Sequence, residues 1–259
     1  MAIRFPYRGW LFDLDGTVYL GEALIPGAAE AITALRAAGR RVAFLSNKPL
    51  QTRDEYAAKL ERLGVPAAAD DVINSSLVLA RHLRALDPGA PVFVIGESPM
   101  LAEMAAHGFE VRDDEHVRWV VIAFDRTFTY AKLNTALQAV LRGARLIATN
   151  PDRTCPVEGG QIPDCAGMIA AVEAVTDTKV ELIVGKPSPI ILEVALAALG
   201  CSAHESVMVG DRIETDMVMG KRQGLATILV LSGVTRPGDP RIDALAPDHV
   251  LRSIRELIG

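Results

Sequence analysis

Two acidic residues near the start of the chain could do chemistry together. The stretch 10–18 reads Trp-Leu-Phe-Asp-Leu-Asp-Gly-Thr-Val, so Asp13 and Asp15 lie two positions apart at the end of an apolar run. The run predicts a buried strand, and the Asp-Gly pair predicts the turn that ends it. Ligands of open α/β sheets bind beyond the carboxyl ends of the strands, where two carboxylates would repel each other unless a cation offset them. Mg²⁺ prefers such oxygen ligands. A carboxylate beside a phosphate can also act as a nucleophile. Taken alone, this motif could instead be a helix cap or an acidic turn.

Three further predicted strands end in polar groups. Ser46 and Asn47 follow the apolar run 41–45, Lys186 follows the run 180–184, and Asp211 follows the run 206–209 with Asp216 five residues later. Taken singly, each could be a cap, a turn residue or a solvated charge. Because all four groups occur at predicted strand ends, we expect them to meet at one edge of a sheet.

The combined set suits phosphoryl transfer. Asp13 would attack phosphorus, and Asp15 would protonate the leaving oxygen and then accept a proton from water. Lys186 would stabilise the charge that develops on the phosphoryl oxygens. The remaining expected roles are phosphate binding by Ser46, Asn47 and Lys186, and Mg²⁺ binding by Asp13, Asp15 (through its carbonyl), Asp211 and Asp216.

The elements that must position these residues alternate between strand and helix. Helices are expected over 26–38, 52–63, 74–86, 99–107, 130–141, 168–175, 189–199 and 214–223, with a last one from about 252; strands are expected over 41–45, 92–96, 120–124, 145–149, 180–184, 206–209 and 226–231; residues 151–167 are expected to form a loop. Such alternation predicts a Rossmann-like doubly wound parallel sheet. A chain of 259 residues favours two cores. We therefore expect a catalytic core of residues 1–87 and 179–259 with an α/β insertion of residues 88–178.

Composition excludes several function classes. Half of the residues are hydrophobic, yet no run approaches the roughly 18 apolar residues of a membrane span, and the first residues lack the apolar segment of a signal peptide. The formal net charge is −5 without a basic block, which argues against a nucleic-acid surface. The three cysteines and five histidines lack the spacing of a zinc site. We expect a reduced, cytoplasmic protein.

The order of these motifs resembles that of the haloacid dehalogenase superfamily of phosphotransferases. Asp13-x-Asp15-Gly16-Thr17 is similar to its first motif, Ser46-Asn47 to its second, Lys186 to its third, and Gly210-Asp211 with Asp216 to its fourth. The long insertion between the second and third motifs resembles the C2 cap subclass, and Thr149-Asn150-Pro151-Asp152 resembles its NagD-type, p-nitrophenyl-phosphatase-like branch. The resemblance implies a Mg²⁺-dependent phosphomonoester hydrolase that acts through an aspartyl-phosphate. An aspartate at position 15 is what the phosphatases of this superfamily carry and its dehalogenases lack.

Two positions depart from that branch. Lys48 stands where relatives usually have a second asparagine, and we expect its side chain, like that of Arg212, to face solvent. In the cap, Ile162-Pro163-Asp164-Cys165-Ala166-Gly167 replaces a Pro-Gly-x-Gly pattern in a loop that the resemblance places at the active site. Expected substrate-contacting cap residues are Asn150, Asp152, Asp164 and Cys165.

Substrate and assembly stay open at this stage. Only 5% of the residues are aromatic, so a stacking cage for a nucleobase is disfavoured, and small sugar or polyol phosphates are expected ahead of nucleotides. A homodimer formed through the cap is possible by resemblance. Two alternatives remain: a non-catalytic protein that binds phosphorylated metabolites on the same fold, and a phosphotransferase with an acceptor other than water.

Overall fold

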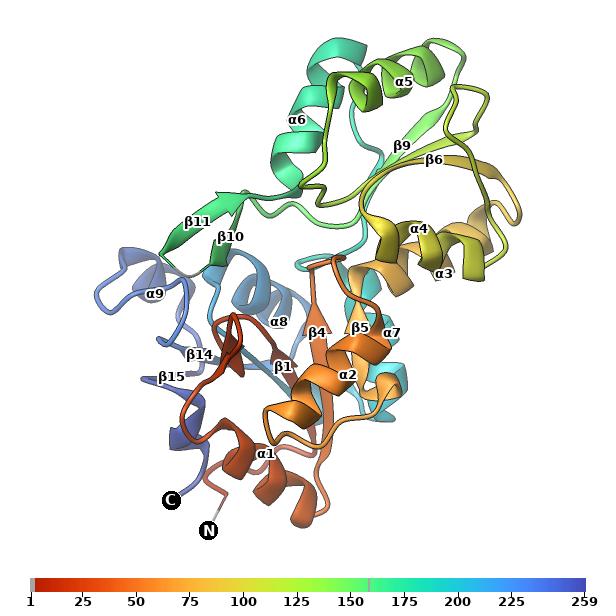
Figure 1. Ribbon diagram of the computed structural model, residues 1–259. Helices are drawn as coiled ribbons and strands as arrows, with labels where there is room; N and C mark the ends of the chain where they lie inside the picture. The colour runs from red at the N-terminus through yellow and green to blue at the C-terminus, as the bar shows by residue number, and fades with distance from the viewer. Residues whose placement is uncertain (1–2, 158) are drawn as a thin grey trace.

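The first sheet carries the predicted catalytic strand at its centre. The computed structural model describes residues 3–157 and 159–259 (Figure 1). Its six parallel strands follow the order β15-β14-β13-β1-β4-β5. The bounds are β1 Gly9–Asp13, β4 Arg41–Ser46, β5 Val72–Asn74, β13 Ser206–Gly210, β14 Ala226–Val230 and β15 His249–Leu251. The chain therefore runs outward from β1 to β5 and then returns beside β1 to start the other half. This reversal places a topological switch point between β1 and β13, where α/β sheets bind their ligands.

Helices cover both faces of this sheet. Alternate residues of β1 point to opposite faces, as strand geometry requires. Trp10 and Phe12 pack against buried residues of α1 and α2, whereas Leu11 packs on the other face of the sheet against residues of α3, α7 and α8. The bounds are α1 Ala28–Ala37, α2 Arg53–Arg62, α3 Ser75–Leu86, α7 Pro189–Leu199, α8 Val218–Gln223 and α9 Pro240–Leu245. A short β2–β3 hairpin (Tyr19–Leu20 and Ala23–Leu24) follows the catalytic strand.

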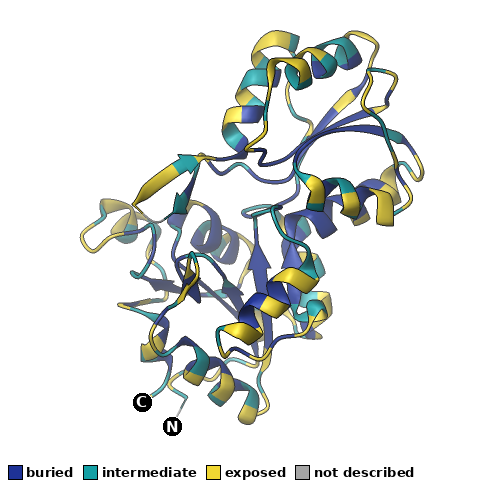
Figure 2. Ribbon diagram, in the orientation of Figure 1, coloured by how far each residue is buried: buried dark blue, intermediate teal, exposed yellow. Residues whose placement is uncertain are grey.

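A second sheet is inserted between α3 and α7. Its five parallel strands follow the order β12-β9-β8-β6-β7. The bounds are β6 Pro91–Ile95, α4 Ser98–Ala106, β7 Glu110–Val111, β8 Trp119–Ile122, α5 Tyr130–Leu141, β9 Arg145–Ala148, α6 Cys165–Thr176 and β12 Leu182–Ile183. We call this insertion the cap. Buried apolar residues continue from the first sheet through α3 into the face of the cap sheet that α4 covers (Figure 2), so the two sheets share one apolar core.

Several sequence expectations need correction. The expected loop 151–167 contains an antiparallel hairpin of β10 (Thr154–Val157) and β11 (Gly160–Pro163), which extends from the cap toward α8 and α9 (Figure 1). Strand β12 was expected in the sheet of the catalytic core, but its residues Leu182 and Ile183 pair with Ile147 and Ala148 of the cap strand β9. The cap sheet therefore continues past residue 178, the expected end of the insertion.

The remaining differences lie at helix ends and in short elements. Helix α6 begins at Cys165 rather than at 168, because Asp164 caps it by accepting a hydrogen bond from the Cys165 main-chain nitrogen. The expected helix 214–223 begins as a π-helix over Ile213–Met217. The expected last helix is a 3₁₀ turn over Ile254–Leu257, and β5, β7, α9 and β15 were not expected. No helix among the described residues is both long and apolar enough to cross a bilayer.

Candidate active site

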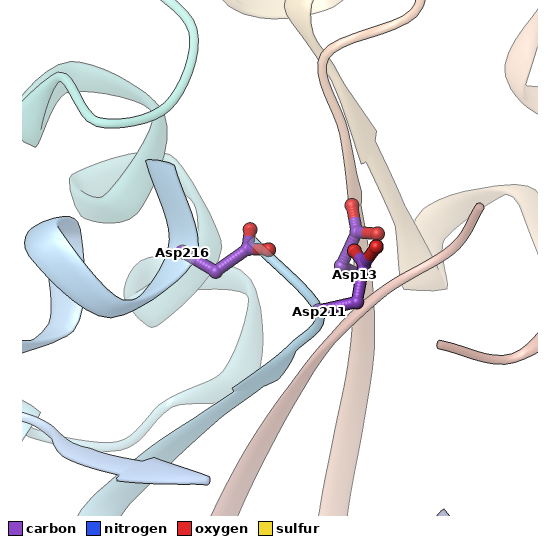
Figure 3. Close-up of side chains that lie close together, drawn as sticks. All are labelled: Asp13, Asp211 and Asp216. Carbon is purple, nitrogen blue, oxygen red and sulfur yellow. The ribbon is translucent and has the colours of Figure 1, made fainter. Parts of the chain in front are cut away.

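Three aspartates converge where β1 and β13 end. Asp13 is the last residue of β1, Asp211 follows β13, and Asp216 lies in the π-helix that comes next (Figure 3). One carboxylate oxygen from each of the three lies within 4.8 Å of the others. One Asp211 oxygen accepts a hydrogen bond from the main-chain nitrogen of Val234, and its Oδ1 is buried with no partner among the described residues. An oxygen-only cluster with an orphaned acceptor fits a hard divalent cation.

The charge balance at this cluster also favours a cation. Lys186 places its ammonium against Asp13 and at 2.7 Å from Asp216 Oδ1. Burial raises the pKa of Asp13, of Asp211 and of Asp216, the last to about 6, while Lys186 opposes this rise at Asp13 and Asp216. Burial disfavours the charged form of Lys186, but Asp13 and Asp216 outweigh it and raise its pKa. One ammonium cannot neutralise three carboxylates, so further positive charge would stabilise the ionised cluster.

Glycines hold the chain close around Asp211. A Cβ atom built at Gly233 would lie 1.9 Å from Asp211 Oδ2, and one at Gly16 would lie 2.5 Å from the same oxygen. Gly16 also has a φ of 90°, which L-residues with a side chain rarely adopt. The loops after β1 and β14 are therefore packed onto the carboxylate. This packing fixes its orientation toward the other two acids.

The end of β4 contributes Ser46 and Asn47. Ser46 is buried and lines the cleft above the acid cluster, with its hydroxyl 3.2 Å from both Tyr56 Oη and the Lys48 main-chain nitrogen. Asn47 Oδ1 accepts from the Lys186 main-chain nitrogen at 2.7 Å, and Asn47 Nδ2 donates to the Lys186 carbonyl oxygen at 3.0 Å. The Asn47 side chain therefore positions Lys186, while the phosphate contact expected of Asn47, which lines the cleft, stays a prediction.

Asp15 lies on the open side of the cluster. Its side chain lines the cleft but does not belong to the group of acids that converge on one point, which are Asp13, Asp211 and Asp216. Its carboxylate therefore stays available for proton transfer, and only its carbonyl is left as a candidate metal ligand. Lys48 Nζ lies 3.7 Å from Asp15 Oδ2. Lys48 thus faces the cleft and not solvent, contrary to expectation.

The cap residues expected to contact substrate divide into two kinds. Asp152 and Asp164 line the cleft. Asn150 is fully buried behind them, and its Nδ2 donates to Asp152 Oδ2 at 2.8 Å and to Asp164 Oδ1 at 3.0 Å. Cys165 is also fully buried, and burial raises the pKa of its thiol to about 12. Neither Asn150 nor Cys165 is among the residues that line the cleft, so Asn150 orients the two acids and Cys165 is a packing residue.

Arg212 joins the core to the cap. Its guanidinium donates to the Thr154 carbonyl oxygen in β10 at 3.0 Å and lies 3.5 Å from Asp152 Oδ1. Asn47 Nδ2 donates to the other oxygen of Asp152 at 2.8 Å. Two residues that neighbour predicted catalytic groups thus bind the same cap carboxylate. Arg212 was expected in solvent, and the sequence shows only an arginine after Gly-Asp.

The hairpin supplies lining residues that the sequence did not indicate. Cys155 and Pro156 of β10 face the cleft, as does Thr215 of the π-helix. Burial is the main cause that raises the pKa of the Cys155 thiol, and Lys48 partly opposes it. The Thr215 hydroxyl is buried without a partner among the described residues. Cys155 and Pro156 are consecutive, so strand alternation could not have indicated both of them, and proline and glycine obscured the strand itself.

Comparisons with known proteins agree with this arrangement. Residues 10–110 match the family model described as haloacid dehalogenase-like hydrolase, and residues 183–257 match a second model of the same kind. The chain belongs to the haloacid dehalogenase-like hydrolases. This assignment and the Rossmann-like fold expected from the sequence are confirmed.

Relatives of this hydrolase are phosphatases by name. It is 42% identical over 250 residues to sugar-phosphatase AraL of Bacillus subtilis (strain 168), which covers 96% of this chain and 91% of the relative. It is 35% identical to an acid sugar phosphatase of Staphylococcus saprophyticus, over 97% of both chains. Among solved structures, a p-nitrophenyl phosphatase from Archaeoglobus fulgidus superposes with a TM-score of 0.91 at 32% identity, covering 97% of this chain and 98% of that one. A 4-nitrophenylphosphatase from Thermotoga maritima gives 0.92 at 34% identity, covering 98% and 97%. The hydrolase is therefore a phosphatase of the NagD-like type.

Proposed function

We propose that this phosphatase is a Mg²⁺-dependent phosphomonoester hydrolase that forms an aspartyl-phosphate on Asp13. The observation that carries the proposal is the arrangement of acids. Asp13 sits in a buried cluster with Asp211 and Asp216 beside the ammonium of Lys186, while Asp15 lines the same cleft outside that cluster. A nucleophile and a general acid need this separation, because one must stay ionised while the other delivers a proton.

The residues then divide the steps of the reaction among them. Asp13 Oδ attacks phosphorus and displaces the leaving oxygen, to which Asp15 gives its proton. Asp15 next takes a proton from a water molecule that hydrolyses the acyl phosphate, and Asp13 is regenerated. Lys186 and the Ser46 hydroxyl bind the oxygens on which negative charge develops. The side chain of Asn47 keeps Lys186 in place through two main-chain hydrogen bonds.

The metal would be held by Asp13, Asp211, Asp216 and the Asp15 carbonyl. When bound, Mg²⁺ would supply positive charge to a phosphate oxygen and to the acids that Lys186 alone cannot neutralise. Asp211 offers an oxygen with no other partner, which is the strongest single sign of a ligand position. The all-oxygen donor set favours a hard divalent ion such as Mg²⁺ over softer ions such as Zn²⁺.

We propose small sugar or polyol phosphates as substrates. The residues that line the leaving-group side are polar, and two of them, Asp152 and Asp164, have carboxylates suited to accept hydrogen bonds from hydroxyl groups. No aromatic residue lines the cleft among the described residues, so a nucleobase would lack a stacking partner. The names of the relatives from Bacillus and Staphylococcus, both sugar phosphatases, support the same class.

The deciding experiment measures phosphate release from a panel of sugar, polyol and nucleoside monophosphates. We expect release that requires Mg²⁺, is greatest with sugar or polyol phosphates, and falls at least about 10³-fold in Asp13→Asn. Asp70→Asn is a matched control, because that side chain is 97% exposed and far along the chain from the site. Release that survives in Asp13→Asn, or that is unaffected by a chelator, would contradict the mechanism.

A further inference from the structure

Three cations line the cleft, and they differ in how well they are paired. Lys186 contacts two carboxylates. Arg212 donates to a carbonyl oxygen and lies near Asp152. Lys48 Nζ lies 3.7 Å from Asp15 Oδ2, Cys155 lines the same cleft, and the Lys48 ammonium makes no hydrogen bond to an oxygen of any described residue. Lys48 is therefore the cation in the described part of the cleft whose charged group makes no hydrogen bond to an oxygen, although Asp15 lies at ion-pair distance from it.

The Lys48 main chain is firmly placed even though its ammonium is poorly paired. Its nitrogen donates to Ser46 Oγ at 3.2 Å, and its carbonyl oxygen accepts from Tyr56 Oη at 2.8 Å. Tyr56 is fully buried. The side chain of Lys48 is 27% exposed and points into the cleft, whose lining includes Asp15 and Cys155. The main chain at Lys48 is thus fixed by Ser46 and Tyr56, and its side chain extends from there along the cleft.

From this geometry we infer that Lys48 selects substrates whose leaving group carries a carboxylate close to the phosphate ester. The inference rests on the proposed function, in which Asp15 donates to the leaving oxygen. A hydrogen bond of about 2.7 Å from Asp15 to that oxygen, added to the 3.7 Å between Asp15 and Lys48, puts Nζ within about 6–7 Å of the leaving oxygen. A carboxylate two or three carbons from that oxygen reaches Lys48, and this carboxylate can accept a hydrogen bond from the Lys48 ammonium.

A carboxylate fits this position better than a second phosphate. Asp152 and Asp164 share the cleft and repel added negative charge, and this repulsion is greater for a dianion than for a monoanion. The same two residues accept hydrogen bonds from hydroxyls on the carbons between ester and carboxylate. The resulting substrate class is the phosphate esters of polyhydroxy acids, which are the carboxylate counterparts of the sugar and polyol phosphates proposed above.

The test compares two esters that differ at one carbon. Glycerol 3-phosphate ends in a hydroxymethyl group where 3-phosphoglycerate ends in a carboxylate. We expect the wild type to have the higher kcat/KM for 3-phosphoglycerate. Lys48→Met lowers that value by about tenfold to hundredfold more than it lowers the value for glycerol 3-phosphate, which is the usual size of a lost hydrogen bond between charged groups. Lys48→Arg keeps the preference because it keeps the charge.

Controls separate this inference from other roles of Lys48 and from the function itself. Lys179→Met removes a lysine charge from a side chain that is 85% exposed, and it should leave both rates unchanged. Equal losses on both esters in Lys48→Met would mean that Lys48 binds the transferred phosphoryl group, and a moved pH profile with glycerol 3-phosphate would mean that it acts through Asp15. Either result overturns the inference. So does an enzyme that prefers fructose 1,6-bisphosphate over fructose 6-phosphate but does not prefer 3-phosphoglycerate over glycerol 3-phosphate. Hydrolysis of neither ester nor of any other phosphate would refute the proposed function instead.

Discussion

Replacing Asp164 by asparagine should stabilise this protein at neutral pH. Asp164 caps helix α6, and its Oδ1 accepts hydrogen bonds from Asn150 Nδ2 and from the Cys165 main-chain nitrogen. An asparagine presents the same oxygen to both donors. The change therefore keeps the cap and the hydrogen bonds while it removes a charge that is 96% buried and faces Asp152.

The size of the effect follows from the pKa. Burial, and then the charge of Asp152, raise the pKa of Asp164 from 3.8 to about 6. One pH unit of difference corresponds to about 1.4 kcal/mol, so ionised Asp164 costs the folded state about 3 kcal/mol. Because the native state holds its proton more tightly than the unfolded chain, this cost is absent below pH 3.8, grows as pH rises toward 6, and is complete above it. A gain of this size would raise Tm by about 6–12 °C.

Thermal unfolding of both proteins from pH 4 to pH 8 tests the reasoning. The matched control is Asp239→Asn, since Asp239 also caps a helix, α9, but is only partly buried and is paired with Arg241, which lowers its pKa to about 2. Its replacement should lower Tm by a nearly constant amount from pH 8 to pH 4, because stabilisation from a pKa of about 2 is lost only below about pH 4. An Asp164→Asn variant whose Tm gain is equal at pH 4 and pH 8, or whose Tm falls at pH 8, would refute the account.

Three further predictions concern the acid cluster and the contacts between core and cap. Lys186→Met leaves Asp13 and Asp216 buried without their cation, so urea unfolding without Mg²⁺ should show a loss of about 3–5 kcal/mol; unchanged stability would contradict the ion pairs. Gly233→Ala places a methyl group 1.9 Å from Asp211 Oδ2, so phosphate release should fall at least about tenfold. The control Gly167→Ala, whose added methyl group meets nothing within 4 Å, should retain full activity. Equal rates for the two variants would contradict the packing at Asp211. Asp152→Ala should cost only about 1–3 kcal/mol of stability, because Asn47, Asn150 and Arg212 each keep a second acceptor. The same change should raise KM for sugar phosphates. A larger loss of stability in the urea titration would show that the cap depends on this one residue.

Much of this architecture was predictable because parallel strands share one carboxyl edge. The apolar runs gave the strands that end at Asp13, Ser46 and Asp211, and the helices 130–141 and 189–199 have the expected ends. The sequence thus predicted that chemistry-bearing side chains would meet, without any knowledge of distances. Regular alternation is a local property, and a sequence reports local properties well.

The errors lie where tertiary contacts decide. Strand β12 has only two residues, and nothing in its composition says that it pairs with β9 instead of a core strand. Pro156 and two consecutive glycines disguised the β10–β11 hairpin. Arg212 and Lys48 look like solvated charges in sequence, because the carbonyl and carboxylate groups they face come from segments far along the chain. Such long-range partners determine orientation, and periodicity does not reveal them.

The hydrogen bond from Arg212 to the hairpin has an evolutionary consequence. Its acceptor is the carbonyl oxygen of Thr154, an atom that every amino acid has. Side chains along β10 can therefore change by mutation without loss of this anchor. Evolution can then exchange the hairpin residues that contact the leaving group, and new substrates can be acquired in this way. The attachment of the hairpin to Arg212 is meanwhile inherited unchanged.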